Sequence, residues 1–296
     1  MTAQTETTSP VRSLLPRLRV WPRAGNGNGM TIVGTVIVLC FAIATIGVLI
    51  WPPAEAYTGN LMERWKAPLE DGSVLGTDQL GRSLLWRVAA GMPWSLGIAF
   101  TAAVIAMTLG TAAGLLAAWS PGPVRRVVQH LVDTVIAFPS LVLAVTVIAL
   151  LGRGFWPLAA TLGLATWPIA ARVVYAEAMS ISKRDYVMAA RLAGVGSTTI
   201  LITHVLPALR PTLLVMFAFT FADMLIAESA LSFLGIGVPL TAPSWGNMLS
   251  ESREYLVEAP QQMLVPATAI VLAVVAFNLI GDGVAAKARS RSRAVE

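Results

Sequence analysis

Residues 94–118 read WSLGIAFTAAVIAMTLGTAAGLLAA and contain no charged side chain. An α-helix rises about 1.5 Å per residue, so a helix of this length crosses the ~30 Å hydrocarbon core of a bilayer. The sequence holds five further apolar runs of comparable length, at 31–51, 131–151, 157–175, 208–231 and 263–281. It therefore predicts six membrane-spanning helices.

The composition agrees with that prediction. The chain has 296 residues, of which 56% are hydrophobic and 12% are charged, and its mean hydropathy is +0.71. A soluble domain carries about twice that charged fraction. The expected fold class is an all-α integral membrane protein. Only a short segment that contains Gly152, Arg153, Gly154 and Phe155 separates the third and fourth runs, which predicts a tight antiparallel helical hairpin.

The segments around the first run need separate interpretation. Residues 1–29 are rich in Thr, Ser, Pro, Gly and Asn, which predicts a disordered tail ahead of a six-helix transmembrane domain at 30–285. Basic residues followed by an apolar run also resemble a secretory signal. The run is too long for a signal core of about 7–15 residues, so we expect it to be retained as a membrane helix.

The basic residues predict the orientation. Only six of the 21 lysines and arginines fall outside if both termini are cytoplasmic: Arg64, Lys66, Arg82, Arg87, Arg153 and Arg253. The positive-inside rule favours this topology. It places 182–206 and a basic tail at 286–296 in the cytoplasm, and outer loops at 52–91 and 235–260. The net charge of +5 is then a feature of topology, so a nucleic-acid partner is not expected.

The polar segment 182–206 interrupts the apolar runs. Ser182 followed by Asp185 predicts a capping box, and Gly194 predicts a helix end with positive φ. Ser197 or Thr198 would cap a second short helix, and Pro207 would open the next span. The first helix is expected to be amphipathic and to dock a partner. Its candidate contact residues are Asp185, Tyr186, Ala189, Ala190, Arg191 and Gly194.

The sequence lacks the residues for enzymatic chemistry. His130 and His204 are far apart, Cys40 is the only cysteine, and no metal-ligand spacing occurs. No Gly-Lys pair exists, so the chain has no Walker-type phosphate loop. We expect no catalytic residue, no metal and no cofactor in this chain. Any ATP and Mg²⁺ would be bound by partner subunits.

Four separated motifs resemble one family. They are Gly76-Thr77-Asp78-Gln79-Leu80-Gly81-Arg82-Ser83; the run from Asp185 to Arg191 with Gly194, His204, Leu206 and Pro207; Leu231 to Val238 followed by Pro243 to Leu249; and Asn278-Leu279-Ile280-Gly281-Asp282-Gly283. Together they resemble the second of the two paired permeases of bacterial ATP-binding-cassette importers for dipeptides, oligopeptides and nickel. Ser83 and Met188 depart from the family pattern, which commonly has acids there. Methionine at 188 would make the docking surface more hydrophobic.

The resemblance implies a set of partners and a mechanism. The partners are a homologous second permease, two ATP-binding-cassette ATPases, an extracytoplasmic substrate-binding protein and membrane lipid, in the bacterial inner membrane. The short cytoplasmic helix that begins at Asp185 would then be a coupling helix, which contacts the ATPases. ATP-driven closure of the ATPases would move this helix and switch the spans between inward-open and outward-open states. The receptor would contact the outer loop, where Ser244, Trp245, Gly246, Asn247, Glu251 and Glu254 are expected to be exposed. Alternatively, Trp245 anchors the loop at the membrane interface.

Two intramembrane acids leave alternatives open. Asp223 and Glu228 lie in the fifth run, where an ionisable residue suggests function. They are candidates for the translocation pathway or its gate, for structural pairing, or for a proton-coupled secondary carrier. Their spacing separates them by about 140° around a helix, so they should not share a face. A noncatalytic scaffold is the remaining alternative. For cargo, scarce imidazole and thiol ligands favour a peptide over nickel or another small solute.

Overall fold

The computed structural model describes residues 27–70, 72–120 and 122–293. Most of the expected N-terminal tail lies outside these ranges, but Gly27 to Gly29 already form the first turn of a helix. The ten α-helices of the described residues are α1 (Gly27–Ile50), α2 (Leu84–Trp119), α3 (Gly122–Ala137), α4 (Ser140–Leu151), α5 (Phe155–Ile181), α6 (Asp185–Leu192), α7 (Ser197–Ile200), α8 (Leu206–Phe233), α9 (Trp245–Glu251) and α10 (Gln261–Arg293).

Short helical turns complete the secondary structure of the described residues. Ala54–Ala56, Leu61–Glu63 and Ser252–Tyr255 are 3-10 helices, and Leu201–Val205 is π-helical. The predicted outer loop at 52–91 is shorter than expected because α2 begins at Leu84. The predicted loop at 235–260 contains α9, and the predicted basic tail from 286 continues α10 up to Arg293.

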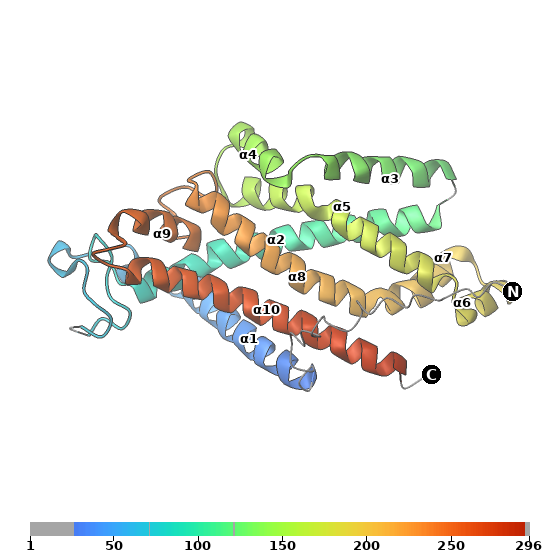
Figure 1. Ribbon diagram of the computed structural model, residues 1–296, viewed down its shortest axis with the longest axis horizontal. Coiled ribbons are helices and arrows are strands. Elements are labelled where there is room, and N and C mark those ends of the chain that lie inside the picture. Colours follow the sequence, from blue (N-terminus) through green and yellow to red (C-terminus); the bar gives the residue numbers. More distant parts are fainter. Residues whose placement is uncertain (1–26, 71, 121, 294–296) are drawn as a thin grey trace, which may run out of the picture.

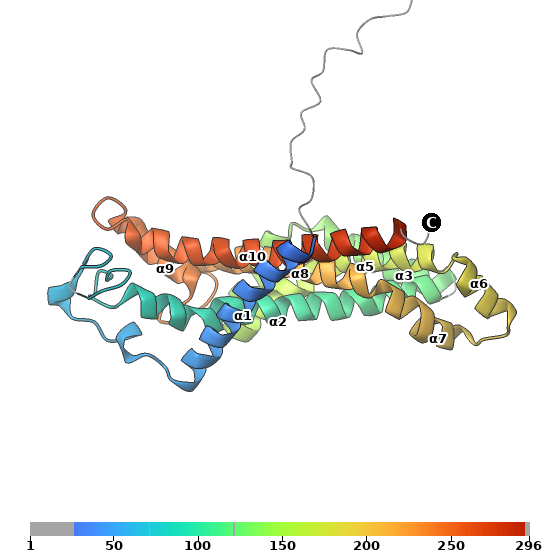
Figure 2. The same cartoon turned by 90° about the horizontal axis from the view of Figure 1, so that it is seen from below.

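Four long helices, α2, α5, α8 and α10, run along the length of the molecule, and α1 crosses α10 at an incline (Figure 1, Figure 2). Glycine allows α2 to approach α5 closely. A Cβ atom on Gly110 would lie 2.4 Å from the Cβ of Ala170, and one on Gly114 would lie 2.7 Å from the carbonyl oxygen of Ala171. These two glycines of the second apolar run therefore serve packing within the chain.

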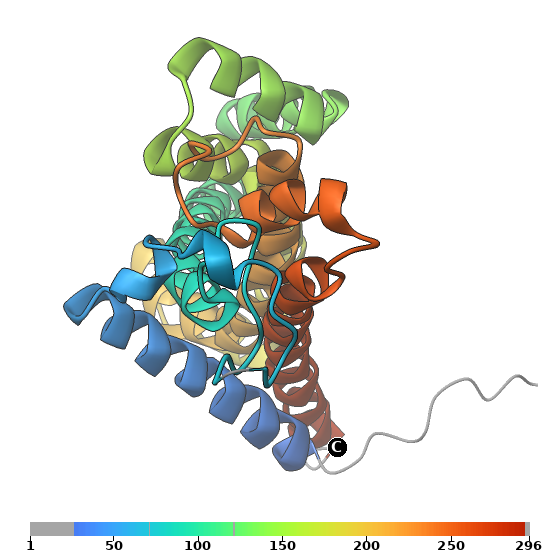
Figure 3. The same ribbon diagram turned by 90° about the vertical axis from the view of Figure 1, so that its left-hand side faces the viewer.

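Among the described residues, five helical segments are long and apolar enough to span a membrane: Asn28–Ile50, Leu84–Trp119, Phe155–Ile181, Ser197–Phe233 and Gln261–Ser290. The remaining predicted span, the third run at 131–151, is not one straight helix. It is divided between α3 and α4, which meet at 89°. Pro139 explains the break, because it lacks a backbone N–H and disfavours helical geometry at Phe138. In the end-on view α3 and α4 lie on the side opposite α1 and α10 (Figure 3).

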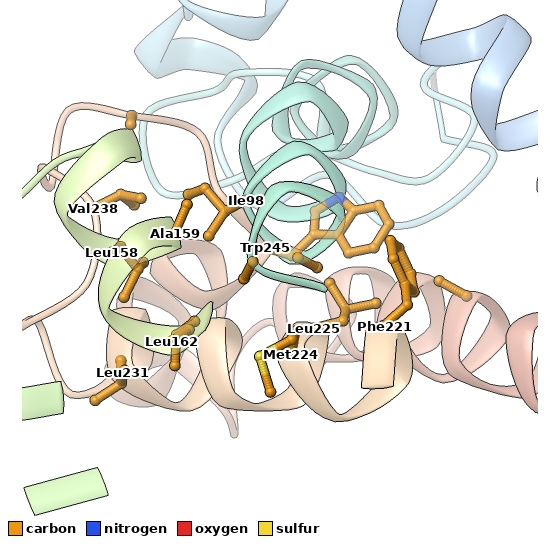
Figure 4. Packing of buried hydrophobic residues seen from close by; sticks show 14 of the residues in the cluster. Ile98, Leu158, Ala159, Leu162, Phe221, Met224, Leu225, Leu231, Val238 and Trp245 are labelled. Atoms are coloured by element: carbon orange, nitrogen blue, oxygen red, sulfur yellow. The ribbon is translucent and has the colours of Figure 1, made fainter. Parts of the chain in front are cut away.

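The larger hydrophobic core lies toward the end of the molecule that carries α9. Ile98 of α2, Leu158 of α5 and Leu225 of α8 meet there around Trp245, and all four are buried (Figure 4). A second core cluster lies at the other end, where α5 and α8 meet α6 and α7. Each cluster thus packs the helices together at one end of the molecule. The sequence analysis predicts that these two ends lie on opposite sides of the membrane.

Candidate coupling, gating and pathway sites

The first candidate site is the projecting end formed by α6 and α7 (Figure 1). One buried residue, Val187, anchors α6 to the bundle. It packs in the second core cluster with Ile181 of α5, Ile200 of α7 and Leu209 of α8. The cluster thus joins α6 to α5, α7 and α8. Val187 was not among the predicted site residues. The sequence signal that could have found it is that Val187 is the one bulky β-branched residue within Asp185–Leu192.

The start of α6 differs from the predicted capping box. The hydroxyl of Ser182 donates a hydrogen bond to the carbonyl oxygen of Met179, 2.8 Å away, so it continues α5 instead of capping α6. Arg184 occupies the N-cap position and makes no side-chain cap. Asp185 is the first residue of α6, where its negative charge suits the positive end of the helix dipole.

The structure confirms the prediction that Gly194 ends this helix with a positive φ. Its φ is +79°, and the N–H of Val195 donates to the carbonyl oxygen of Ala190 at 3.1 Å. This pattern terminates a helix through a left-handed residue, which glycine adopts without steric cost. No atom lies within 4 Å of the position a Cβ would take, so the requirement for glycine comes from the backbone alone.

The second short helix differs from its prediction. Gly196 is the N-cap of α7, and neither Ser197 nor Thr198 caps it through its side chain. The chain then passes through the π-helical stretch directly into α8, so Pro207 lies within a continuous helical path. The wider π turn accommodates a proline that cannot donate a backbone hydrogen bond.

The outer face of α6 carries two exposed apolar side chains. Leu192 is 88% exposed and Met188 is 52% exposed, and the two lie one turn apart. Tyr186 is partly exposed and stacks on His204 with ring centroids 6.3 Å apart. The guanidinium of Arg191 lies 5.6 Å from the ring centroid of Trp119. Such a ridge, held rigidly from behind by Val187, can bind a groove on a partner protein.

At the opposite end, the exposure expected for Ser244, Trp245, Gly246 and Asn247 is wrong. All four are buried. The indole N–H of Trp245 donates to the carbonyl oxygen of Val88 at 2.9 Å, and its backbone N–H donates to the hydroxyl of Ser95 at 3.0 Å. Trp245 is therefore neither a free receptor contact nor an interfacial anchor.

The two polar residues of this segment hold the loop together. The hydroxyl of Ser244 accepts a hydrogen bond from the backbone N–H of Asn247 at 3.1 Å, which caps α9. The amide of Asn247 donates to the carbonyl oxygens of Pro239 and Ala242 at 2.8 and 3.0 Å. These three hydrogen bonds join the loop at 239–242 to the start of α9.

A charged cluster connects the outer loop, α2 and α9. Arg87 on α2 donates to Asp78 and to Glu251, at 2.8 Å in each case. Arg82 donates to Asp78 at 2.6 Å and lies 3.3 Å from Glu251. The side chains of Asp78 and Arg87 are 1% and 5% exposed. Glu251, expected to face a receptor, is thus an internal partner with a side chain 27% exposed, whereas Glu254 is exposed.

The two intramembrane acids face different surroundings. Asp223 is exposed on the surface of α8, whereas Glu228 is fully buried and accepts hydrogen bonds from the hydroxyls of Ser232 at 2.9 Å and Ser229 at 3.3 Å. The prediction that they do not share a face is confirmed. Because its partners are serine hydroxyls inside the chain, Glu228 fits the structural alternative. Asp223 is available to a pathway or to a second subunit.

The broken helix carries another ion pair, which the sequence did not reveal. Asp133 of α3 accepts a charge-assisted hydrogen bond from Arg172 of α5. The pair lies at a cavity of about 280 Å³ between α2, α3 and α5. Both side chains remain more than half exposed. The two residues are 39 positions apart, so only the packing of α3 on α5 brings them together.

Residues 110–293 match the family model described as binding-protein-dependent transport system inner membrane component. The chain belongs to this family. It is 36% identical to the di/tripeptide transport system permease protein of Pseudomonas aeruginosa over 84% of this chain and 82% of that protein. It is 30% identical to the nickel transport system permease protein of Escherichia coli over 83% of this chain and 89% of that protein.

The fold of this inner membrane component is shared with a solved transporter. An inward-facing structure of the MetNI methionine ABC transporter aligns with a TM-score of 0.56 and 20% identity, covering 67% of this chain and 94% of that chain. The chain is therefore a multi-pass membrane permease with the fold of an ABC importer component.

Proposed function

We propose that this chain forms half of the translocation pathway of an ATP-driven importer for di- or oligopeptides. A homologous second permease supplies the other half, two ATP-binding-cassette subunits bind ATP and Mg²⁺, and an extracytoplasmic binding protein delivers the cargo. The observation that carries the proposal is α6, which exposes Met188 and Leu192 on one side and is fixed by Val187 on the other. That geometry suits transmission of force from a motor to α5 and α8.

The mechanism follows from rigid packing. Closure of the ATPases displaces α6, and the buried contacts of Val187 carry the displacement into the bundle because packed cores transmit strain. The bundle then exchanges between two packings, inward-open and outward-open. Asp223 would line the pathway or the interface with the second permease, since a carboxylate facing lipid is costly. Both termini and α6 would be cytoplasmic.

Peptide is the proposed cargo, and the peptide-transporting relative supports it. A zwitterionic peptide has two charged ends that hydrocarbon excludes, so it requires a polar pathway. The exposed Asp223 and the Asp133–Arg172 pair give this chain charges of both signs along its helices. Nickel, or a chelated nickel complex, is the alternative supported by the other relative.

The test is uptake by the reconstituted complex with its cognate receptor. We expect receptor- and ATP-dependent uptake of labelled short peptides, and competition by unlabelled peptides. Chelated nickel, added in a parallel reaction, should neither enter nor compete. Receptor-dependent nickel uptake without any peptide uptake would assign the same machinery to the other cargo. Uptake driven by a proton gradient without ATP would contradict the importer assignment itself.

The coupling site has its own control within α6. Leu192→Ser removes an exposed apolar contact, so the ATPase should no longer copurify with the permease. Val187→Ala tests the anchor instead. It should leave the ATPase bound but reduce transport, because it creates a cavity behind α6. Normal copurification and uptake in Leu192→Ser would remove the ridge from the docking role.

A further inference from the structure

A cavity of about 710 Å³ opens between α1, α8 and α10, on the side of the molecule away from α3 and α4. Its lining divides by chemistry. Arg210, Lys287, Asn28 and Thr31 are polar, whereas Leu214 and Val284 are apolar. Each of the three helices contributes at least one polar residue. The proposed function uses none of these residues.

The three helices bring the polar residues to one level of the bundle. Gly34 of α1 lies against the backbone of Ala276 and the side chain of Ile280 on α10. Gly281 of α10 lies against Phe219 on α8. Asn28 precedes Gly34 in α1, Arg210 precedes Phe219 in α8, and Lys287 follows Gly281 in α10. These ends of the three helices are the ones directed toward α6 (Figure 1, Figure 2). With the predicted topology, the polar part of the cavity lies near the cytoplasmic surface of the membrane.

The two basic residues are exposed and available to a ligand. Within residues 27–70, 72–120 and 122–293, neither Arg210 nor Lys287 forms an ion pair with a carboxylate. The cavity also lies at the amino-terminal end of α1, where the helix dipole favours an anion. Two cations from different helices facing one cavity repel each other until an anion lies between them.

The apolar part of the cavity continues into the bilayer. Leu214 lies one turn beyond Arg210 on α8, and Ile32 of α1 is exposed on the same cavity. A soluble anion would leave this surface uncovered. A phospholipid covers both parts, because its phosphate meets the cations while its acyl chain lies along the apolar residues.

We propose that this cavity is a binding site for one anionic phospholipid, whose phosphate is held by Arg210 and Lys287. Each basic residue near a membrane surface contributes on the order of 1 kcal/mol to binding of anionic lipid. The site would join α1, α8 and α10 at their ends. The inference depends on the membrane placement of these helices and not on the cargo or the partners.

Native mass spectrometry of the full chain with added phosphatidylglycerol or phosphatidylethanolamine tests the site. We expect retention of one phosphatidylglycerol in preference to phosphatidylethanolamine. The double variant Arg210→Gln, Lys287→Gln should lower that retention by about thirtyfold, from the loss of two surface charges. The matched control is Arg126→Gln, which removes an exposed arginine of α3 outside the cavity and should change nothing.

Four outcomes would overturn the proposal. Equal loss of lipid in Arg126→Gln would mean that net charge alone attracts the lipid. Equal retention of phosphatidylglycerol and phosphatidylethanolamine would mean that the basic pair does not select the anionic lipid. Displacement of the lipid by soluble glycerol 3-phosphate at equal concentration would mean that the site binds a phosphate and not a lipid. A drop in thermal midpoint of the double variant without added lipid would reveal a folding role instead.

Discussion

At the scale of single residues, the cluster of Asp78, Arg82, Arg87 and Glu251 has the clearest energetic consequence. Two carboxylates and two guanidiniums neutralise one another in a largely buried site, with Asp78 accepting from both arginines. Breaking a buried ion pair by removing one partner commonly costs about 3–5 kcal/mol, because the remaining charge is left uncompensated. Asp78 is therefore the residue on which the outer loop depends.

We predict that Asp78→Ala lowers the thermal midpoint of the purified protein strongly and exposes the outer loop to protease. Glu254→Gln is the matched control, since it removes an exposed acid from the same end and leaves the cluster intact. Its thermal midpoint should equal that of the wild type. A midpoint of Asp78→Ala equal to that of the control would show that the cluster contributes no net stability.

At the scale of elements, α6 is short, polar and dependent on its ends. Its eight residues could not hold a helix alone in water. Val187 attaches it to the bundle, and the left-handed Gly194 ends it and directs the chain into α7. The angle between α6 and the bundle is thus determined by one buried contact and one backbone conformation.

We predict that Gly194→Val impairs transport or assembly with the ATPase while the protein still inserts in the membrane. A β-branched residue at a φ of +79° is strained by on the order of 1–3 kcal/mol. Gly196→Val is the matched control, because Gly196 has a φ of −60° and its Cβ would meet only Thr199 at 3.8 Å. Normal uptake and ATPase stimulation in Gly194→Val would exclude the glycine from coupling.

At the scale of the whole molecule, the two ends have different chemistry. One end carries α6, the exposed apolar ridge and the basic carboxyl-terminal part of α10, and the other carries α9, the ion cluster and the acids Glu254 and Glu258. The spans between them bury small residues and direct most charge to the ends. The asymmetry of charge predicts a single orientation for this bundle in a membrane.

We predict that α6 faces the cytoplasm, and labelling of single cysteines in a Cys40→Ala background tests this orientation. Lys183→Cys should be protected from an impermeant thiol reagent in intact cells and react after permeabilisation. Glu63→Cys should react in both cases, since Glu63 lies in the outer loop and its side chain is 48% exposed. Labelling of Lys183→Cys in intact cells would reverse the topology and with it the cytoplasmic position of α6.

The sequence by itself determined the membrane class, because the length and apolarity of each run are properties of local composition. It also determined the end of α6, since a glycine after a short polar helix predicts a left-handed residue whatever surrounds it. The order of the motifs predicted the family. These features depend on residues that are close together along the chain, and their order can be read directly from the sequence.

Only the tertiary structure decided which residues are partners. Trp245 reads as a surface residue in a polar loop, yet it is 0% exposed because α2, α8 and α1 enclose it. Glu251 reads as a receptor contact, yet Arg87, 164 positions earlier, binds it. Arg210 and Lys287 read as topology signals, yet they face one cavity. Burial and pairing arise from packing between distant segments, and no local pattern encodes which segments will meet.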